Sequence, residues 1–202
     1  KIKDLPMEKY KYIDDLGSGG YGTAKKYEID TEDVAIKNEL HEYPTQSIVC
    51  EISALYNLER VPGTLNVKDI IIGPYQKNKG VEYNLVTDLY DDTISTFCSN
   101  HITNDSEFLC FIKKLIASLD SIHHHGYIHR DMKCANIVAK KTVDSYEICI
   151  IDYNTVMINN DNLIFEFDCS TWNYRSPERF FGDNKYTQKH DIWGMGCMII
   201  HL

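Results

Sequence analysis

The spacing of apolar residues changes once along the chain, near Asp88–Asp92, and this change constrains the fold more than any other feature. Before it, apolar residues alternate with polar ones, as they do in strands that bury one face. After it, an apolar stripe from Phe108 to Ile122 recurs at helical spacing and is ended by Gly126. The sequence therefore predicts an α+β fold, with a hinge between a strand-rich lobe and a mostly helical lobe.

Within the first lobe the pattern predicts a small sheet interrupted by one helix. The helix follows Pro44, and a turn at 30–33 joins the first two strands. Strands are expected at 21–29, 34–37, 67–72 and 82–87. A final helix of the second lobe is expected to begin near Gln188.

Charge and cysteine content exclude several classes of protein. The 202-residue chain has a formal net charge of −9, which argues against nucleic acid as its main partner, because phosphate binding needs an excess of Lys and Arg. No run of about 18 apolar residues is present, so no bilayer-spanning helix is expected. The seven cysteines form no CxxC pair and are odd in number, which indicates free thiols in a reducing compartment. We therefore expect an intracellular protein, cytoplasmic or nuclear.

The segment Gly17–Gly22 (GSGGYG) matches GxGxxG, a pattern that also fits the dinucleotide-binding fingerprint. In a dinucleotide fold the last glycine opens a helix, whereas here an alternating strand follows. A glycine-rich turn between two strands can lie close over phosphates, because no side chain stands in the way. Taken alone, the turn would be better explained as an ordinary hairpin, and only the motifs that follow favour a phosphate flap.

The strand Val34–Lys37 (VAIK) places Ala35 and Lys37 on one face. A small residue beside an ammonium suits a flat base next to a polyphosphate. A lysine that faces a cleft needs a carboxylate to position it, and Glu51 in the following helix is the natural candidate. A surface lysine and a solvated helix face are the alternatives for these two residues, and each is plausible alone.

The segment His129–Asn136 (HRDMKCAN) matches HRDxKxxN at every fixed position, and chance agreement there is negligible. At this point the sequence resembles the eukaryotic protein kinases, with the motifs in the right order along the whole chain. The resemblance implies that Asp131 is the catalytic carboxylate that accepts the substrate hydroxyl proton. It also implies that Lys133, as in serine/threonine kinases, offsets the charge of the transferring phosphoryl group. Asn136 would be a ligand of the second Mg²⁺.

The metal-binding DFG of that family corresponds to Asp152-Tyr153-Asn154. Asp152 keeps the carboxylate that Mg²⁺ requires, a hard oxygen ligand for a hard cation. Asn154 departs from the family pattern. Because Asn is the commonest non-glycine residue at positive φ, the turn can be kept with less freedom to flip. This departure affects switching and rate rather than Mg²⁺ binding.

Later segments extend the resemblance to protein kinases, and Tyr174-Arg175 ahead of Pro177-Glu178 resembles the YRxPE of the cyclin-dependent kinases. Thr171 matches the threonine that contacts the catalytic aspartate and lysine, and Asp191 opens DxWxxG, whose aspartate braces the catalytic loop. In cyclin-dependent kinases a phosphorylated threonine occupies the position of Glu166. We expect Glu166 to pair with Arg130 and to make activity independent of an activating kinase. A solvated acidic loop is an equally good reading of Glu166.

The resemblance also implies a nucleotide pocket. Thr87 aligns with the gatekeeper, the backbone of Asp88 and Tyr90 would bond the base, and Ala24 and Val138 would lie above and below the adenine. Core packing is the alternative for Ala24 and Val138. The residues expected to bind ATP are Leu16, Gly17, Ser18, Gly19, Gly20, Tyr21, Gly22, Ala24, Ala35, Lys37, Thr87, Asp88, Tyr90 and Val138.

The implied architecture is the bilobal protein-kinase fold. An antiparallel-sheet N-lobe at 1–88 would carry the glycine-rich loop, the VAIK lysine and a regulatory helix. A partial, mostly helical C-lobe at 89–202 would carry the catalytic loop, the activation segment and the start of the long central helix. On family length, the domain would continue past Leu202.

The implied function is a protein serine/threonine kinase that transfers the γ-phosphoryl of Mg·ATP to protein hydroxyls. The main alternative is a nucleotide-binding pseudokinase that acts as a scaffold, favoured by Asn154. The intact charged and metal-binding positions oppose it; they are Lys37, Glu51, Asp131, Asn136 and Asp152. A dinucleotide-dependent oxidoreductase is excluded by the strand after Gly22. A cyclin-like activator is left open, because Cys50 replaces the arginine that cyclin-dependent kinases carry there.

Overall fold

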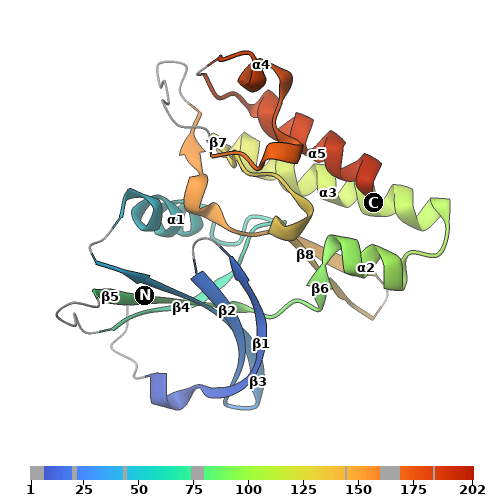
Figure 1. The fold of residues 1–202 in the computed structure, drawn as a ribbon. Helices are drawn as coiled ribbons and strands as arrows, with labels where there is room; N and C mark the ends of the chain where they lie inside the picture. Colours follow the sequence, from blue (N-terminus) through green and yellow to red (C-terminus); the bar gives the residue numbers. More distant parts are fainter. Residues whose placement is uncertain are drawn as a thin grey trace. The chain divides into compact units, whose positions relative to one another are not determined.

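The computed structural model describes residues 7–19, 22–42, 45–73, 80–143, 145–159, 169–183 and 185–202. The chain forms two compact units, one made of 1–49 and 65–90 and the other of 50–64 and 91–202. The helix α1 (Gln46–Asn57) runs from the first unit into the second. The expectation of an α+β fold is confirmed, since the first unit is built on strands and the second mainly on helices (Figure 1).

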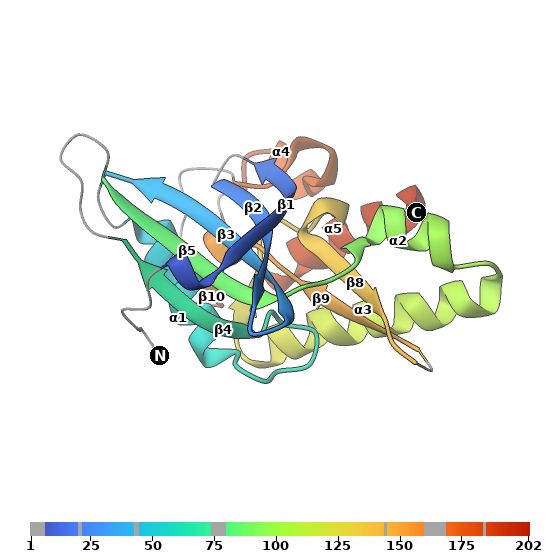
Figure 2. The ribbon, with the colours of Figure 1, turned by 90° about the horizontal axis from the view of Figure 1, so that it is seen from below.

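The first unit is a five-stranded antiparallel sheet in the order β1-β2-β3-β5-β4 (Figure 2). Its elements are the 3-10 turn η1 (Met7–Lys9) and the strands β1 (Lys11–Gly19), β2 (Gly22–Ile29), β3 (Glu32–His41), β4 (Val67–Ile72) and β5 (Val81–Asp88). Asp30 and Thr31, which join β2 to β3, both have positive φ, of 48° and 72°. Two-residue hairpins favour such a turn because its twist matches that of the strands, so the predicted turn at this place is confirmed.

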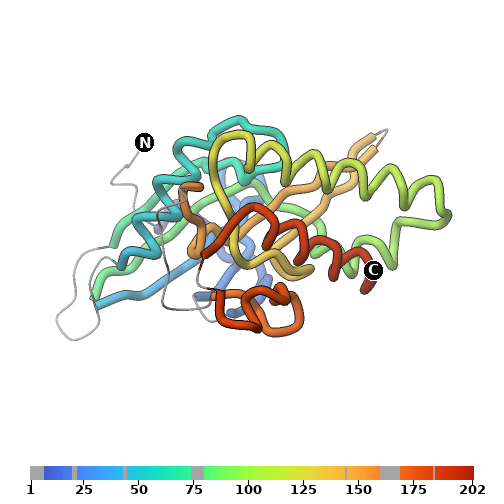
Figure 3. The backbone as a smooth tube through the Cα atoms, turned by 90° about the horizontal axis from the view of Figure 1, so that it is seen from above, coloured from blue at the N-terminus to red at the C-terminus, as the bar shows by residue number. Residues whose placement is uncertain are grey.

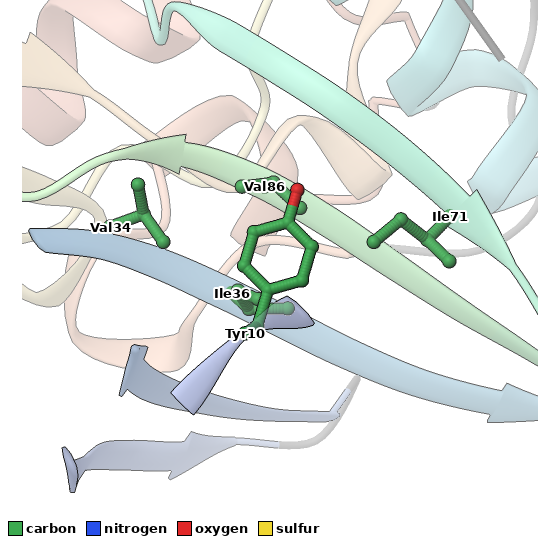
Figure 4. Packing of buried hydrophobic residues seen from close by; sticks show 5 residues of the cluster. All are labelled: Tyr10, Val34, Ile36, Ile71 and Val86. Carbon is green, nitrogen blue, oxygen red and sulfur yellow. The ribbon is translucent and has the colours of Figure 1, made fainter. Parts of the chain in front are cut away.

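One face of this sheet is closed by an apolar cluster. The cluster consists of Tyr10, Val34, Ile36, Ile71 and Val86, all buried (Figure 4). Because successive side chains of a strand point to opposite faces, burying Val34 and Ile36 turns their β3 neighbours to the other face. The packing of Val34 and Ile36 into the core therefore places the Lys37 side chain on the opposite face of β3.

The second unit combines helices with short strands. Its helices after α1 are α2 (Ile94–His101), α3 (Asp105–His124), α4 (Pro177–Phe180) and α5 (Gln188–His201). Its strands are β6 (Asp92–Thr93), β7 (Tyr127–Ile128), β8 (Ile137–Lys141), β9 (Tyr146–Ile150) and β10 (Met157–Ile158). Three 3-10 turns complete it, namely η2 (Cys134–Asn136), η3 (Tyr153–Thr155) and η4 (Trp172–Tyr174). The strands pair as β6-β8-β9 and as β10-β7.

The helix α3 begins and packs as its sequence predicts. The Asn104 side chain caps its first turn by accepting the Glu107 N–H at 3.0 Å. One stripe of the helix is buried, through Phe111, Leu115 and Ile122 among others. The predicted helix is confirmed, and Leu115, Leu119 and Ile122 of its predicted stripe are buried, whereas Ile116 is 49% exposed.

The end of α3 and the start of α5 lie side by side, as Figures 1 and 3 both show. The Gln188 side-chain amide donates to the His123 carbonyl at 2.9 Å, which ties the first turn of α5 to the last turn of α3. The strand β7 and the loop that follows it leave directly from this junction. This loop carries the HRD motif, so helix packing sets its position. Within the described ranges, no helix is both long and apolar enough to cross a membrane.

Candidate active site

The loop between β7 and β8 holds a buried carboxylate, that of Asp131, which is 5% exposed. Thr171 donates to its Oδ1 twice, from Oγ1 at 2.7 Å and from the backbone N–H at 3.0 Å. Lys133 Nζ donates to the other oxygen, Oδ2, at 2.6 Å, and also to Thr171 Oγ1 at 3.2 Å. The expected contact of Thr171 with the aspartate and the lysine is therefore confirmed.

These donors set the ionisation of Asp131. Burial alone would raise its pKa, but hydrogen bonds and the charge of Lys133, with the hydrogen bonds of Thr171, outweigh burial and hold the pKa below its usual value. The carboxylate is therefore ionised at neutral pH although it is buried. An ionised carboxylate beside an ammonium can accept a proton while a neighbouring negative charge is offset.

The loop is braced by Asp191 at the start of α5, which is 1% exposed. Its Oδ2 accepts the His129 N–H and its Oδ1 accepts the Arg130 N–H, each at 2.8 Å. The expected brace through backbone hydrogen bonds is confirmed. The structure adds His123, whose Nε2 lies 2.8 Å from Asp191 Oδ2. His123 could not be singled out beforehand, because it stands within a run of three histidines at a helix end.

Two oxygen-bearing side chains lie at the adjoining ends of β8 and β9. Asn136 precedes β8 and Asp152 follows β9, and the Ile151 N–H donates to the Asn136 carbonyl at 2.9 Å. The Asn136 side-chain nitrogen donates to the Asp131 carbonyl at 2.8 Å and to Asp131 Oδ2 at 3.1 Å, which turns its Oδ1 away from that residue. An amide oxygen and a carboxylate are donors that suit Mg²⁺, so the pair fits this metal. Among the described residues, no cluster of three or more His, Cys, Asp or Glu side chains could hold a metal.

The backbone after β9 corrects one expectation. Asp152 is the residue with positive φ, at 67°, and Asn154 lies inside the 3-10 turn η3. The expectation that Asn154 occupies a positive-φ position is therefore wrong. A 3-10 turn has ordinary negative φ, so it makes no demand for glycine there. Asn154 is buried in this turn.

Glu51 lies on α1 and is buried. Its Oε1 accepts the backbone N–H of Tyr153 at 3.2 Å, which links α1 to the segment after β9 within the second unit. The Tyr153 ring is fully buried and meets the His129 ring edge-on at 5.4 Å. Pairing of Glu51 with Lys37 stays a prediction, since the two residues belong to different units.

The glycine-rich turn joins β1 to β2. Gly17 and Gly19 lie on β1, and a Cβ added to either would meet nothing within 4 Å. At Gly22 a Cβ would come within 2.2 Å of the Asn38 carbonyl oxygen, so this position requires glycine. Leu16 and Ser18 also lie on β1, whereas Gly20 and Tyr21 fall outside the described residues.

The other residues expected around a nucleotide occupy neighbouring strands of the first unit. In the sheet register Ala24 lies opposite Lys37, and Ala35 lies opposite Thr87. Thr87 is buried, with Oγ1 at 3.4 Å from the Ala35 carbonyl oxygen. Asp88 ends β5 and Tyr90 follows it. Val138 belongs to the other unit, on β8, where it pairs with Thr93 and Cys149.

Lys37 has a partner that the sequence reasoning missed. Its Nζ lies 2.9 Å from Oε1 of Glu39, two residues along the same strand, and the Glu39 side chain is only 4% exposed. The sequence did contain a clue to this contact, because residues 37 and 39 must lie on the same face of β3. Glu39 lies outside every motif named above, so it was passed over.

Arg130, before Asp131, also has contacts within the second unit. Its Nε donates to the Thr155 carbonyl, and its guanidinium lies over the Tyr186 ring, 5.1 Å from the centroid. Arg179 lies over the same ring at 4.4 Å. The proposed partner Glu166 falls outside the described residues, so its pairing with Arg130 stays a prediction. All seven cysteines are free thiols, as expected from their number and spacing.

Comparison with known proteins adds to this geometry. The family model described as protein kinase domain matches residues 10–202. Cyclin-dependent kinase 12 of Caenorhabditis elegans is 29% identical over 211 residues, which cover 97% of this chain and 28% of that protein. Mitogen-activated protein kinase 13 of Arabidopsis thaliana is 28% identical over 210 residues, covering 100% and 56%. Glycogen synthase kinase 1 of Pyricularia oryzae is 27% identical over 209 residues, covering 100% and 51%. The chain thus spans between 28% and 56% of the length of these relatives.

Proposed function

Because the chain belongs to the protein kinase domain family, we propose that it transfers the γ-phosphoryl group of ATP to serine or threonine hydroxyls of protein substrates. The observation that carries this proposal is the environment of Asp131. A buried carboxylate kept ionised by Lys133 and Thr171 is what a general base for a hydroxyl needs. A relative in Dictyostelium discoideum whose name is probable cyclin-dependent serine/threonine-protein kinase, 28% identical over 198 residues, supports the choice of serine and threonine.

In the proposed reaction the substrate hydroxyl oxygen forms a bond to the γ-phosphorus as the bond from that phosphorus to the ADP oxygen breaks. Asp131 accepts the proton of the hydroxyl. Lys133, within 2.6 Å of Asp131 Oδ2, offsets negative charge on the transferring group. Thr171 holds the other carboxylate oxygen by two hydrogen bonds, which fixes the direction from which the carboxylate meets the hydroxyl.

Asn136 and Asp152 would hold Mg²⁺, through the amide oxygen and the carboxylate. When bound, the metal neutralises charge on the β- and γ-phosphates. Asn136 can present its oxygen because two hydrogen bonds to Asp131 fix its nitrogen. These same bonds couple the metal position to the base, so both would be set by one loop.

Lys37, in the first unit, would bind the phosphates of ATP, and Glu51, in the second unit, is the carboxylate proposed to position it. Gly17 and Gly19 would cover the phosphates, since neither carries a side chain to obstruct them. The adenine would lie near Ala24, Ala35 and Thr87. A kinase of this kind would act on protein substrates. A cyclin-like activator is a further proposal, which the geometry of the site neither supports nor opposes.

The test is incorporation of labelled phosphate from γ-labelled ATP into a generic basic protein, using the full-length protein. Asp131→Asn is the control, because it keeps the shape of the side chain and removes the base. Transfer by the parent that the variant lacks supports the proposal. Binding of ATP by both proteins without transfer by the parent would favour the alternative, a nucleotide-binding pseudokinase.

A further inference from the structure

One face of β3 carries three side chains that form a chain of contacts. Lys37, Glu39 and His41 stand at alternate positions and therefore point the same way. Glu39 Oε1 lies 2.9 Å from Lys37 Nζ, and Glu39 Oε2 lies 2.9 Å from His41 Nε2. Both oxygens of one carboxylate are thus engaged by residues of its own strand.

The middle member of this chain is the most deeply buried. The Glu39 side chain is 4% exposed, whereas those of Lys37 and His41 are 23% and 21% exposed. Burying a carboxylate costs several kcal/mol unless a charged or hydrogen-bonding partner compensates for it. A buried glutamate with both oxygens in contact with partners has a fixed position, and it can in turn fix the positions of those partners.

The start of β2 lies next to this side chain. A Cβ at Gly22 would lie 3.0 Å from Glu39 Cγ, so the start of β2 packs against the Glu39 side chain. Ala24, the next residue of β2 on the same face, lies opposite Lys37. Small residues of β2 thus lie opposite both members of the pair.

We propose that Glu39 is a positioning residue that holds the Lys37 ammonium for the phosphates of ATP, with His41 holding Glu39 in turn. This proposal rests on the function proposed above, in which Lys37 binds ATP. Because Lys37 and Glu39 stand two positions apart on one strand, their pair forms within β3 itself. The position of Lys37 then has a support that does not depend on Glu51.

The test compares the affinities of the full-length protein for ATP and for adenosine. Because adenosine has no phosphates, the ratio of the ATP affinity to the adenosine affinity reports the contribution of contacts to the phosphates. Glu39→Gln should weaken ATP binding by about tenfold, because a charge-assisted contact of Lys37 is lost, and should leave adenosine binding within about twofold. Glu28→Gln on β2 is the matched control. It removes an exposed carboxylate that lies 3.8 Å from Lys11 Nζ, and it should leave both affinities unchanged.

A second arm tests whether Glu39 acts through Lys37. In a Lys37→Met background, adding Glu39→Gln should change the ATP-to-adenosine ratio no further. A merely structural role would instead weaken both ligands and would persist in that background. If the parent itself binds ATP no better than adenosine, the proposed nucleotide function fails. If the parent prefers ATP and Glu39→Gln keeps or increases that preference, the role of Glu39 is overturned while the function stands.

A third variant covers the case in which Glu39→Gln does not fold. His41→Phe keeps an aromatic ring near Tyr83, whose ring centroid lies 6.3 Å from that of His41, and removes the contact to Glu39 Oε2. It should lower the preference for ATP by about two- to threefold, since one contact to the Glu39 carboxylate is lost. An unchanged preference in a folded His41→Phe protein would overturn the proposed chain of contacts.

Discussion

Thr171 Oγ1 lies 2.7 Å from one carboxylate oxygen of Asp131, and Lys133 Nζ lies 2.6 Å from the other. Lys133 Nζ also donates to Thr171 Oγ1, at 3.2 Å. Thr171 lies 40 residues beyond Asp131 in the sequence, so the segment it belongs to must be in place for this triangle to form. The triangle therefore links the ionisation of the candidate base to the folding of a distant segment.

Replacing Asp131 by Asn should reduce phosphoryl transfer by about 10²- to 10⁴-fold, because the group that accepts the hydroxyl proton is removed. ATP affinity should stay within a few-fold of the parent, since in the proposed reaction Asp131 does not bind the nucleotide. Steady-state kinetics and direct ATP titration measure the two effects separately. Near-normal turnover in the variant would show that another group is the base.

Replacing Thr171 by Val should move the acidic limb of the pH–activity profile to higher pH, because the lost hydrogen bond had favoured the ionised form. The pKa of Asp131 is held low by Lys133 and Thr171 against the opposing effect of burial. In the parent the ionised base therefore persists below about pH 4, the usual range of Asp, and is lost only as pH falls through the depressed value.

Thr171→Ser is the matched control, because it keeps both the hydroxyl and the backbone donor. Its acidic limb should coincide with that of the parent. The profile of kcat/KM, which reports the free enzyme, is the one to measure. A profile that Thr171→Val leaves in place would mean that the hydroxyl does not govern the ionisation of Asp131.

The sequence predicted the elements whose residues follow a regular period or a dense motif. The apolar stripe of α3 and the apolar–polar alternation of β3 could be predicted because each element buries a single face. Ile122 of α3 and Ile36 of β3 are examples of these buried residues. The contact between Asp131 and Lys133 could be predicted because the HRDxKxxN motif places both residues in one loop. Thr171 could be placed only through resemblance, because nothing local connects it to that loop.

The contacts that escaped prediction involve single polar residues whose partners cannot be read from spacing. His123 pairs with Asp191 across 68 positions of sequence, which no periodicity reveals. Glu39 is buried although its strand reads as polar. The turn at Asn154 was misjudged because the positive φ falls two residues earlier, at Asp152. In each case packing from other elements decides the environment of the side chain.

Replacing Thr87 by Met should exclude inhibitors that reach behind the adenine, while ATP affinity stays within about threefold. Thr87 is small and buried, and its neighbours opposite are Ala35 on β3 and Val67 on β4. A longer side chain there would occupy space that a small hydroxyl leaves to the inhibitor. Inhibition constants for the parent and the variant decide this, with Thr87→Ser as control. Equal inhibition of Thr87→Met and the parent would show that Thr87 does not border the inhibitor site.

Replacing Asp191 by Ala should destabilise the protein by about 3–5 kcal/mol, because a buried carboxylate that accepts from several donors is removed and the donors stay behind. Those donors are the backbone N–H groups of His129 and Arg130, with the His123 ring nitrogen at 2.8 Å. Asp120→Ala, at an exposed position of α3, is the matched control and should change stability by less than about 0.5 kcal/mol. Urea unfolding followed by fluorescence gives both values.

His123→Phe separates the two kinds of donor. It keeps a ring, removes the ring nitrogen and leaves both backbone N–H groups on Asp191, so it should cost about 1 kcal/mol. Turnover should also fall more in Asp191→Ala than in His123→Phe, because only the former releases the backbone next to Asp131. If His123→Phe destabilised the protein as much as Asp191→Ala, the ring contact between α3 and α5 would be the main support of the loop, and the two backbone hydrogen bonds would be secondary.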